Sequence, residues 1–361
     1  MVDLGFKEID EIPDGLLTVD STGLLELLGG PTLIHLQGNR KDSLFVSVML
    51  HGNEFTGLLA IQRVLRRYQD RELPRSLSIF IGNVAAAKES LRTLPGQPDY
   101  NRIWGYGDTP EHQMTHHVME SMRKRAVFAA IDVHNNTGKN PHFTLICRHD
   151  NSSYHLATLF GRTVVYAIKP DTTNTWGMSE LCPAVTLECG MPGDQHGVEH
   201  AVEFVDACLH LSQFPEQPLP EHDMDLYHLV SIIKIPSRYS FTFNKNGKDP
   251  DIKLETDLAF DQDLTSMNFS EVPAGTSFCH VREDSDAFLE AWDEHGKDQS
   301  VNYFMRDGDQ YRFRLPVMPA MLTDNANVIR LDCLCYLMER IDWKSIQDKT
   351  PGGEDIPVQT S

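Results

Sequence analysis

The sequence predicts an α/β fold with a mixed, largely parallel central sheet flanked by helices, followed by a smaller β-rich C-terminal domain. Two observations predict this. Up to about residue 215, short apolar segments alternate with stretches of helical periodicity, which is typical of layered α/β proteins. After the proline-rich segment 214–222, the segments 239–243 and 310–315 instead alternate apolar and polar residues, as half-buried strands do.

Each predicted strand is a short apolar, often β-branched segment, and each predicted helix repeats apolar residues at helical spacing, as Leu58, Ile61 and Leu65 do. The predicted strands cover 31–37, 44–50, 77–83, 126–133, 142–147, 163–168 and 183–188. The predicted helices cover 55–69, 84–92, 111–125, 151–161 and 196–213. We expect an α/β domain in 1–215 with its core in about 30–215, a β-rich domain in 222–350 and a flexible tail in 351–361.

The first candidate site residues are His51 and Glu54, which stand between the strand at 44–50 and the helix at 55–69. In open α/β sheets, ligands bind beyond the carboxyl ends of the strands. The pattern H-x-x-E occurs five times in the chain, beginning at His51, His117, His196, His200 and His280. Three of the others lie inside predicted helices, and His280 has no matching partner nearby. Of the five H-x-x-E pairs, only His51 and Glu54 are therefore predicted to be metal ligands.

Asp132 and His134 stand at the end of the strand predicted at 126–133. Because side chains alternate along a strand, Asp132 and His134 are expected to point to the same face. A carboxylate beside a metal-binding imidazole commonly accepts its second N–H. We expect His134 to be the third ligand; the alternative is a capped strand end with an ordinary surface histidine.

Glu188 closes the strand at 183–188, and glycine-rich chain follows it. In a partly dry cleft, burial would raise the pKa of this carboxyl group toward neutrality, which suits a general base. Two ligands on a short spacer, a distant third ligand and a later carboxylate are what a catalytic zinc hydrolase needs, because three protein ligands leave one zinc position open for water. The alternative for Glu188 is an edge glutamate in a salt bridge.

Arg92 and the pair Asn101-Arg102 lie between these strands. Arginine binds carboxylates with two hydrogen bonds and polarises carbonyl oxygens. An Asn-Arg pair in a loop suits the recognition of a substrate carboxylate. The alternative is that both arginines are solvated loop residues.

Taken in order, these motifs resemble the zinc carboxypeptidase superfamily, and within it the succinylglutamate desuccinylase/aspartoacylase family most. Segment 132–137 is similar to the aspartoacylase form of the third-ligand motif, and 182–188 to the desuccinylase form. The resemblance covers about residues 30–215 well and the C-terminal third weakly. It is carried by His51-x-x-Glu54, Arg92, Asp99-x-Asn101-Arg102, Asp132-x-His134 and Glu188.

For the metal site, the resemblance implies one zinc ion per chain. His51, Glu54 and His134 would bind it, and Asp99 and Asp132 would lie behind these ligands.

For the substrate, the resemblance implies that Glu188 activates the attacking water and passes its proton to the leaving amine. Arg92 would support the polarised carbonyl, and Asn101 with Arg102 would hold a substrate carboxylate. Aspartoacylases have a further substrate-binding arginine about ten residues before the catalytic glutamate. Here segment 176–180 is Trp-Gly-Met-Ser-Glu, so we expect a different substrate pocket.

The chain has a formal net charge of −20, which argues against nucleic acid or an anionic membrane as a partner. No segment approaches the ~20 apolar residues of a membrane span. The same charge repels an anionic substrate. Either the cleft is locally positive through zinc, Arg92 and Arg102, or the substrate is less anionic than is usual in the family. Seven scattered cysteines and the lack of a secretory signal predict a reduced, cytoplasmic protein.

We therefore expect a zinc-dependent hydrolase that cleaves the amide bond of an N-acyl amino acid or a related small amide, with a small anionic molecule as substrate. Whether the chain forms a homo-oligomer stays open. One alternative is a metallocarboxypeptidase in which Asn101 and Arg102 hold the C-terminal carboxylate of a peptide. A second alternative is a non-catalytic binding protein on the same fold.

Overall fold

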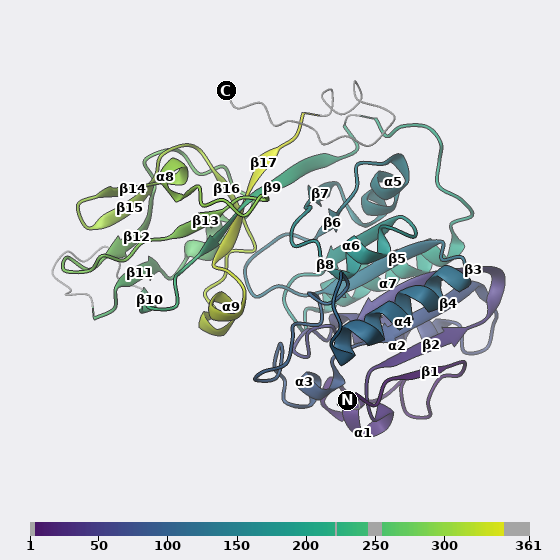
Figure 1. Cartoon of the computed structure of the whole chain (residues 1–361). Helices are drawn as coiled ribbons and strands as arrows, with labels where there is room; N and C mark the ends of the chain where they lie inside the picture. The colour runs from purple at the N-terminus through teal and green to yellow at the C-terminus, as the bar shows by residue number, and fades with distance from the viewer. Residues whose placement is uncertain (1–3, 221, 245–254, 343–361) are drawn as a thin grey trace.

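The computed structural model describes residues 4–220, 222–244 and 255–342. Its main element is a 12-stranded mixed sheet with helices on both faces (Figure 1). This confirms the predicted α/β class. The strands of the sheet follow the order β1 (Lys7–Ile9), β2 (Thr32–Leu36), β4 (Leu73–Ile81), β3 (Gly38–Val48), β5 (Ala129–His134), β8 (Ala184–Glu188), β6 (Phe143–Ile146), β7 (Thr163–Tyr166), β9 (Asp225–Lys234), β17 (Cys335–Arg340) and β16 (Met318–Ala320), and β13 (Glu290–Trp292) pairs with β9.

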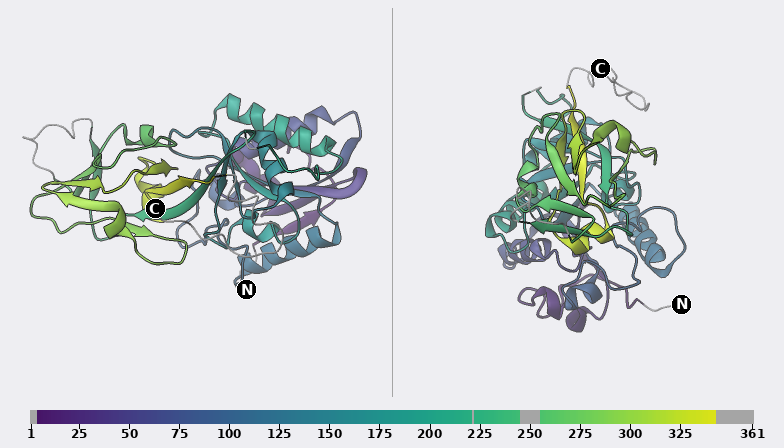
Figure 2. Two further views of the ribbon diagram at one scale, coloured as in Figure 1. Left: turned by 90° about the horizontal axis from the view of Figure 1, so that it is seen from above. Right: turned by 90° about the vertical axis from the view of Figure 1, so that its left-hand side faces the viewer.

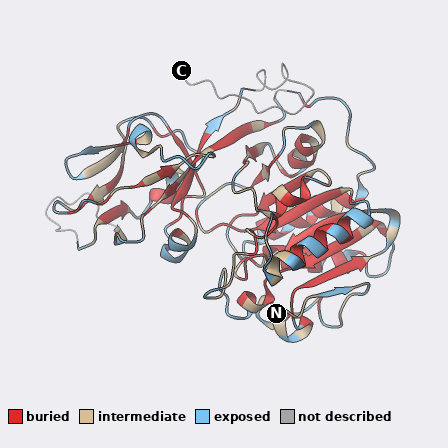
Figure 3. Ribbon diagram, in the orientation of Figure 1, coloured by how far each residue is buried: buried red, intermediate tan, exposed pale blue. Residues whose placement is uncertain are grey.

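The helices cover the sheet because its central strands are apolar on both faces (Figure 3). Val46 and Ile79 pack in one hydrophobic cluster with α2, α5 and α7, whereas Phe45 and Phe80 pack in another with α4 and α6. All four side chains are fully buried. The helices are α1 (Leu24–Leu28), α2 (Thr56–Arg67), α3 (Val84–Lys88), α4 (Pro110–Lys124), α5 (Asn151–Phe160), α6 (Asn174–Met178), α7 (Gln195–His210), α8 (Ser300–Tyr303) and α9 (Ala326–Leu331), with 3-10 turns at Ser21–Gly23 and Leu264–Met267.

The C-terminal third is rich in strands, as predicted, and it is joined to the main sheet. β9 pairs in parallel with β7, and β17 pairs antiparallel with β9. A second, five-stranded sheet lies at the far end of the molecule from α2 and α4 (Figure 2). It consists of β10 (Phe241–Asn244), β11 (Leu258–Asp261), β12 (Ser277–Val281), β15 (Gln310–Phe313) and β14 (Phe304–Asp307).

The domain division at about 215–222 stays a prediction, because the main sheet continues across it through β9. The predicted flexible tail at 351–361 lies outside the described residues. No helix in the described ranges is both long and apolar enough to cross a membrane.

Two predicted boundaries differ from the structure because single residues adopt left-handed backbone angles. The strand predicted at 126–133 begins only at Ala129, after Ala126 with φ 49°. The helix predicted at 84–92 ends at Lys88, shortly before Ser90 with φ 54°. Neither a strand nor a right-handed helix continues through such a residue.

Two short helices that border the site were not predicted. α6 has five residues and α9 has six, too few for a periodic apolar pattern to be recognised. Both have side-chain caps, from Thr173 to the Trp176 N–H and from Asn325 to the Asn327 and Val328 N–H groups.

Candidate functional site

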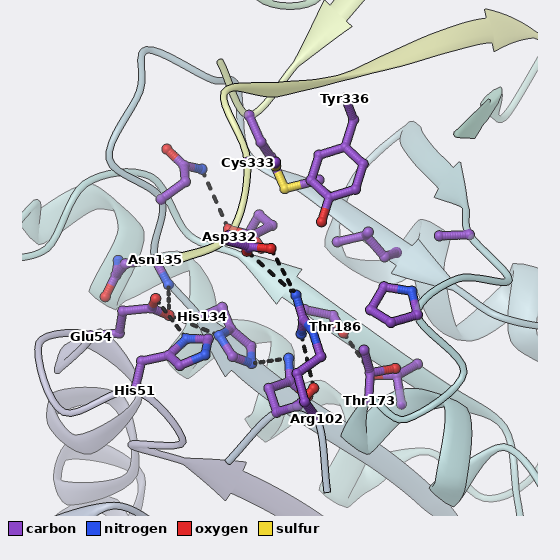
Figure 4. Close-up of a pocket in the computed structure, with 18 of the residues that line it drawn as sticks. His51, Glu54, Arg102, His134, Asn135, Thr173, Thr186, Asp332, Cys333 and Tyr336 are labelled. Carbon is purple, nitrogen blue, oxygen red and sulfur yellow. Dashed lines mark hydrogen bonds and ion pairs between the residues drawn. The ribbon is translucent and has the colours of Figure 1, made fainter. Parts of the chain in front are cut away.

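A cavity lies beyond the carboxyl ends of β3, β5 and β8, three adjacent and parallel strands (Figure 4). The β3–α2 connection supplies His51 and Glu54, and His134 and Glu188 end β5 and β8. His134 and Glu188 are register partners across the two strands. The sheet topology therefore brings side chains from distant parts of the sequence to one edge.

His51, Glu54 and His134 form a buried cluster at the base of this cavity. Their exposed fractions are 2, 7 and 4%. The two carboxylate oxygens of Glu54 lie 2.8 Å from Nδ1 of His51 and 2.8 Å from Nδ1 of His134. One ligand atom from each residue lies within 4.8 Å of the others. Two imidazoles and one carboxylate are a catalytic zinc donor set, so the residues present fit that ion.

Each imidazole also has a carboxylate on its far side. Nε2 of His51 is 2.9 Å from Asp99 Oδ1, and Nε2 of His134 is 2.7 Å from Asp132 Oδ2. The predicted contact between Asp132 and His134 is therefore present. Because Nε2 faces a carboxylate in both residues, Nδ1 is the nitrogen that faces Glu54 and is available for a metal.

The same carboxylates set the charge of the two histidines in the metal-free protein. Burial alone would lower the pKa of His134, but Asp132 and Glu54 outweigh it and raise that pKa well above the ordinary value. Burial and Arg92 also lower the pKa of His51, and Glu54 with Asp99 reverses the effect. Metal binding must therefore release protons from this cluster.

Local backbone structure positions the ligands from β3. Met49 has φ 59°, which turns the chain out of the strand just before His51. Gly52 packs against α3: a Cβ atom at this position would lie 2.2 Å from the backbone nitrogen of Ala87. Its own N–H donates to the carbonyl of Arg92 at 3.1 Å. Only glycine allows this close approach of two backbones.

Asn135 links the ligand-bearing segments and was not among the predicted residues. Its backbone N–H donates to Glu54 Oε2 at 3.0 Å, and its side-chain oxygen accepts from the Thr56 N–H at 3.2 Å. Its side-chain N–H donates to the carbonyl of Gly190 at 2.9 Å. Its place directly after His134, inside segment 132–137, is the sequence signal that could have identified it.

Glu188 is 7% exposed and lies beside this cluster. Burial raises the pKa of its carboxyl group to about 7; the charge of Glu54 adds to this effect and His134 opposes it. Its Oε2 atom accepts from the side chain of Asn136 at 3.4 Å. Glu188 is therefore a buried carboxyl group that can both accept and donate a proton near neutral pH.

Arg92 lines the cavity and contacts three carboxylates, one of them from the metal cluster. Its Nη1 is 3.5 Å from Glu54 Oε1, and its Nη2 is 3.1 Å from Asp99 Oδ2. The same Nη2 is 3.3 Å from Oδ2 of Asp332, a residue not selected from the sequence. Burial lowers the pKa of Arg92, but these carboxylates outweigh that effect and raise it, so the guanidinium stays charged.

Arg102 and Asn101 have different partners. Nη2 of Arg102 is 3.4 Å from each carboxylate oxygen of Asp332. The side-chain oxygen of Asn101 accepts from the first N–H of α6, that of Asn174, at 2.8 Å. Its side-chain nitrogen lies 3.3 Å from His134 Nε2. Asn101 thus connects α6 to the metal cluster, whereas Arg102 connects to the C-terminal region.

The segment that lacks the expected arginine, 176–180, forms the end of α6 and the two residues after it. Hydroxyl groups line this part of the cavity, from Thr173, Thr175 and Thr186. The Oγ1 atoms of Thr175 and Thr186 are 2.7 Å apart. Segment 176–180 thus contributes no arginine to this lining, and the expectation of a substrate pocket different from that of aspartoacylases stays a prediction.

The other H-x-x-E histidines have partners elsewhere. His117 pairs with Glu8 at 2.7 Å, and His280 lies 3.5 Å from Asp309. His196 and His200 are on α7, where His200 Nδ1 lies 2.9 Å from Nδ1 of His142. Within the described ranges, His51, Glu54 and His134 form the one group of three or more such ligands with metal-site spacing.

The chain matches the model of one protein family. Residues 41–210 match the family model described as the succinylglutamate desuccinylase/aspartoacylase catalytic domain. A search of curated proteins gave no match. All the site residues predicted from the sequence lie inside the matched segment, and Asp332 lies outside it.

Solved structures of similar fold include a succinylglutamate desuccinylase from Chromobacterium violaceum, which has 16% sequence identity and a TM-score of 0.54. The match covers 86% of this chain and 88% of that chain. A succinylglutamate desuccinylase/aspartoacylase from Rhodobacter sphaeroides has 14% identity, the same two coverages and a TM-score of 0.56. A mutant of murine aminoacylase 3 has 15% sequence identity and a TM-score of 0.54, and the match covers 84% of this chain and 95% of that chain. At these identities the similarity concerns the fold.

Proposed function

The chain belongs to the succinylglutamate desuccinylase/aspartoacylase family, and on that premise we propose that it is a zinc-dependent hydrolase of an N-acyl amino acid or a related small amide. The observation that carries the proposal is the convergence of His51, Glu54 and His134 within 4.8 Å, beside the buried carboxyl group of Glu188. A purely structural role would not require three buried polar ligands at the base of a cavity.

His51 and His134 would hold the ion through Nδ1, and Glu54 through its carboxylate. Asp99 and Asp132 keep the Nε2–H of each imidazole in place, so that the lone pair of Nδ1 faces the site. When bound, zinc supplies a Lewis acid for the amide carbonyl and lowers the pKa of water.

Glu188 is proposed to accept the proton of the attacking water and to deliver it to the nitrogen of the leaving amine. A carboxyl group with a pKa of about 7 suits both steps, because neither transfer is strongly uphill near neutral pH. The Asn136 side chain donates to Glu188 and so orients it.

Arg92 is proposed to stabilise the negative charge that develops on the carbonyl oxygen, since its guanidinium lies beside Glu54 and stays charged. Asn101 and Arg102 are proposed to lie along the amine half of the substrate, where an N-acyl amino acid carries its carboxylate. The seven cysteines are all unpaired, which supports a reducing compartment such as the cytoplasm.

Metal analysis followed by a hydrolysis screen tests the proposal. The purified chain is stripped with a chelator, reloaded with zinc and assayed on N-acyl amino acids, their carboxamides and dipeptides. We expect one zinc ion per chain and release of an amine from acylated substrates. Cleavage of dipeptides but not of acylated amino acids would instead support the metallocarboxypeptidase.

Two histidine variants provide a matched control for the metal site. His51→Gln and His196→Gln both change the first residue of an H-x-x-E pattern. We expect the first to lose zinc and activity and the second, on the exposed surface of α7, to retain both. Failure of the unsubstituted chain to take up zinc would contradict the proposed function.

A further inference from the structure

The two arginines of the cavity share a carboxylate that belongs to the protein itself. Asp332 Oδ2 lies 3.3 Å from Arg92 Nη2, and both oxygens of Asp332 lie 3.4 Å from Arg102 Nη2. Figure 4 shows the Asp332 and Arg102 side chains pointing toward each other across the cavity. Asp332 directly follows α9, whereas both arginines belong to the segment 41–210.

Asp332 is held firmly in this place. Its backbone N–H donates to the carbonyl of Val328 at 2.8 Å. The next two residues, Cys333 and Leu334, are buried, and the Leu334 N–H donates to the carbonyl of Ile233 at 2.8 Å. The backbone that carries the carboxylate is therefore anchored to the main sheet on one side and to α9 on the other.

This carboxylate leaves the arginines without surplus charge. Arg92 also pairs with Asp99 at 3.1 Å, so two guanidinium groups face two aspartates. A third cation lines the cavity, Lys169, and it is 2.6 Å from Asp171. Each of the three arginine and lysine side chains that line the cavity in the described part of the chain is thus already paired with a carboxylate.

A free carboxylate on the substrate would meet Asp332 at Arg102. Two carboxylates in contact repel each other strongly in a half-buried site, and Arg102 is shared between them. An uncharged carboxamide has no such conflict: its carbonyl oxygen can accept from Arg102, and its N–H can donate to Asp332. The net charge of −20 acts in the same direction, because it repels anionic ligands.

We propose that Asp332 is a specificity-determining residue that excludes a carboxylate from the amine half of the substrate and selects amides that carry an uncharged group there, such as a carboxamide. This inference rests on the proposed amide hydrolase. On this inference, Arg102 donates to an uncharged oxygen of the substrate. The substrate is then a neutral molecule and not the small anion expected from the sequence.

The test compares N-acetylglycine with N-acetylglycinamide, the smallest pair that differs only in the carboxylate. With zinc-loaded protein, we expect kcat/KM to favour the carboxamide by on the order of tenfold, chiefly through KM. Asp332→Asn should abolish or reverse this preference, and Asp332→Ala should change it in the same direction. Calorimetric titration of both compounds into Glu188→Gln protein, with and without Asp332→Asn, gives the same comparison without turnover.

Asp324→Asn is the matched control, because it removes the same charge from an exposed residue just before α9. It should leave the preference unchanged. A protein that prefers the carboxylate compound, or treats the two alike, would contradict the role of Asp332 while leaving the amide hydrolase intact. A zinc-loaded protein that cleaves none of the N-acyl amino acids, carboxamides and dipeptides of the hydrolysis screen would contradict the proposed function itself.

Discussion

Asp132 lies directly behind His134: its Oδ2 atom is 2.7 Å from Nε2, while Nδ1 of the same ring faces Glu54 at 2.8 Å. The other oxygen of Asp132 accepts from Ser47 at 2.6 Å. Ser47 lies on β3 and Asp132 on β5, and the two residues are register partners. The orientation of the imidazole is therefore determined by two neighbouring strands of the main sheet.

Asp132→Asn should weaken zinc binding by roughly 10- to 100-fold, because an amide does not fix the Nε2–H tautomer as a carboxylate does and lowers the basicity of the ligand. Competition with a chromophoric chelator measures the change. Asp284→Asn removes an exposed carboxylate that pairs with Arg282 at 2.6 Å and should leave zinc affinity unchanged. Equal affinity in the Asp132 variant and the unsubstituted protein would contradict the orienting role.

Glu188 makes the stability of the metal-free protein depend on pH. Its pKa rises from an ordinary value of 4.5 to about 7 on folding, mainly through burial. The contribution of protonated Glu188 to the stability of the folded protein is therefore fully present below about pH 4.5 and is lost as the pH rises through about 7. Above that pH, the buried carboxylate costs roughly 3 kcal/mol.

Glu188→Gln should accordingly raise the free energy of unfolding of the metal-free protein at about pH 8 by roughly 2–3 kcal/mol, and change it little at about pH 5. Urea unfolding in the presence of a chelator measures both values. Glu180→Gln, at an exposed position before β8, should show no such pH dependence. A Glu188 variant that is less stable at both pH values would show that burial does not raise this pKa.

The seven cysteines should be unreactive in the folded protein. Six are buried and Cys182 is partly buried, and burial raises the pKa of every one of these thiols. Because the thiolate is the reactive form, iodoacetamide should label the folded protein far more slowly than the unfolded chain. Mass spectrometry measures the labelling. Loss of zinc on brief treatment with a thiol reagent would indicate a cysteine ligand and contradict the histidine–glutamate site.

The sequence was sufficient to place His51, Glu54, His134 and Glu188 at strand ends. Apolar segments identify the strands, and the carboxyl ends of parallel strands meet at one edge of a sheet. The pattern does not determine which strands are neighbours. The order β3-β5-β8, which brings His134 beside Glu188, is a property of the whole sheet.

Asp332 could not be predicted in the same way. It is separated by 230 residues from Arg102, and a single aspartate after a six-residue helix has no distinguishing pattern. Its position depends on the pairing of β17 with β9, which brings the C-terminal region back to the cavity. Long-range pairing of this kind is specified by packing and not by local periodicity.

Gly52 is the position where a single methyl group should disturb the metal site most directly. A Cβ atom there would lie 2.2 Å from the backbone nitrogen of Ala87 in α3 and 2.6 Å from the backbone carbonyl oxygen of Leu91, whose N–H donates to the carbonyl of Ala86 in the same helix. Gly52→Ala should therefore separate α3 from the β3–α2 connection, destabilise the protein by about 1–3 kcal/mol and weaken zinc binding through His51. Thermal unfolding and metal analysis measure the two effects. Gly161→Ala is the matched control, since a Cβ atom at that extended residue meets no atom within 4 Å. If Gly52→Ala unfolds at the same temperature as Gly161→Ala and retains zinc, the close approach of these two backbones does not position His51.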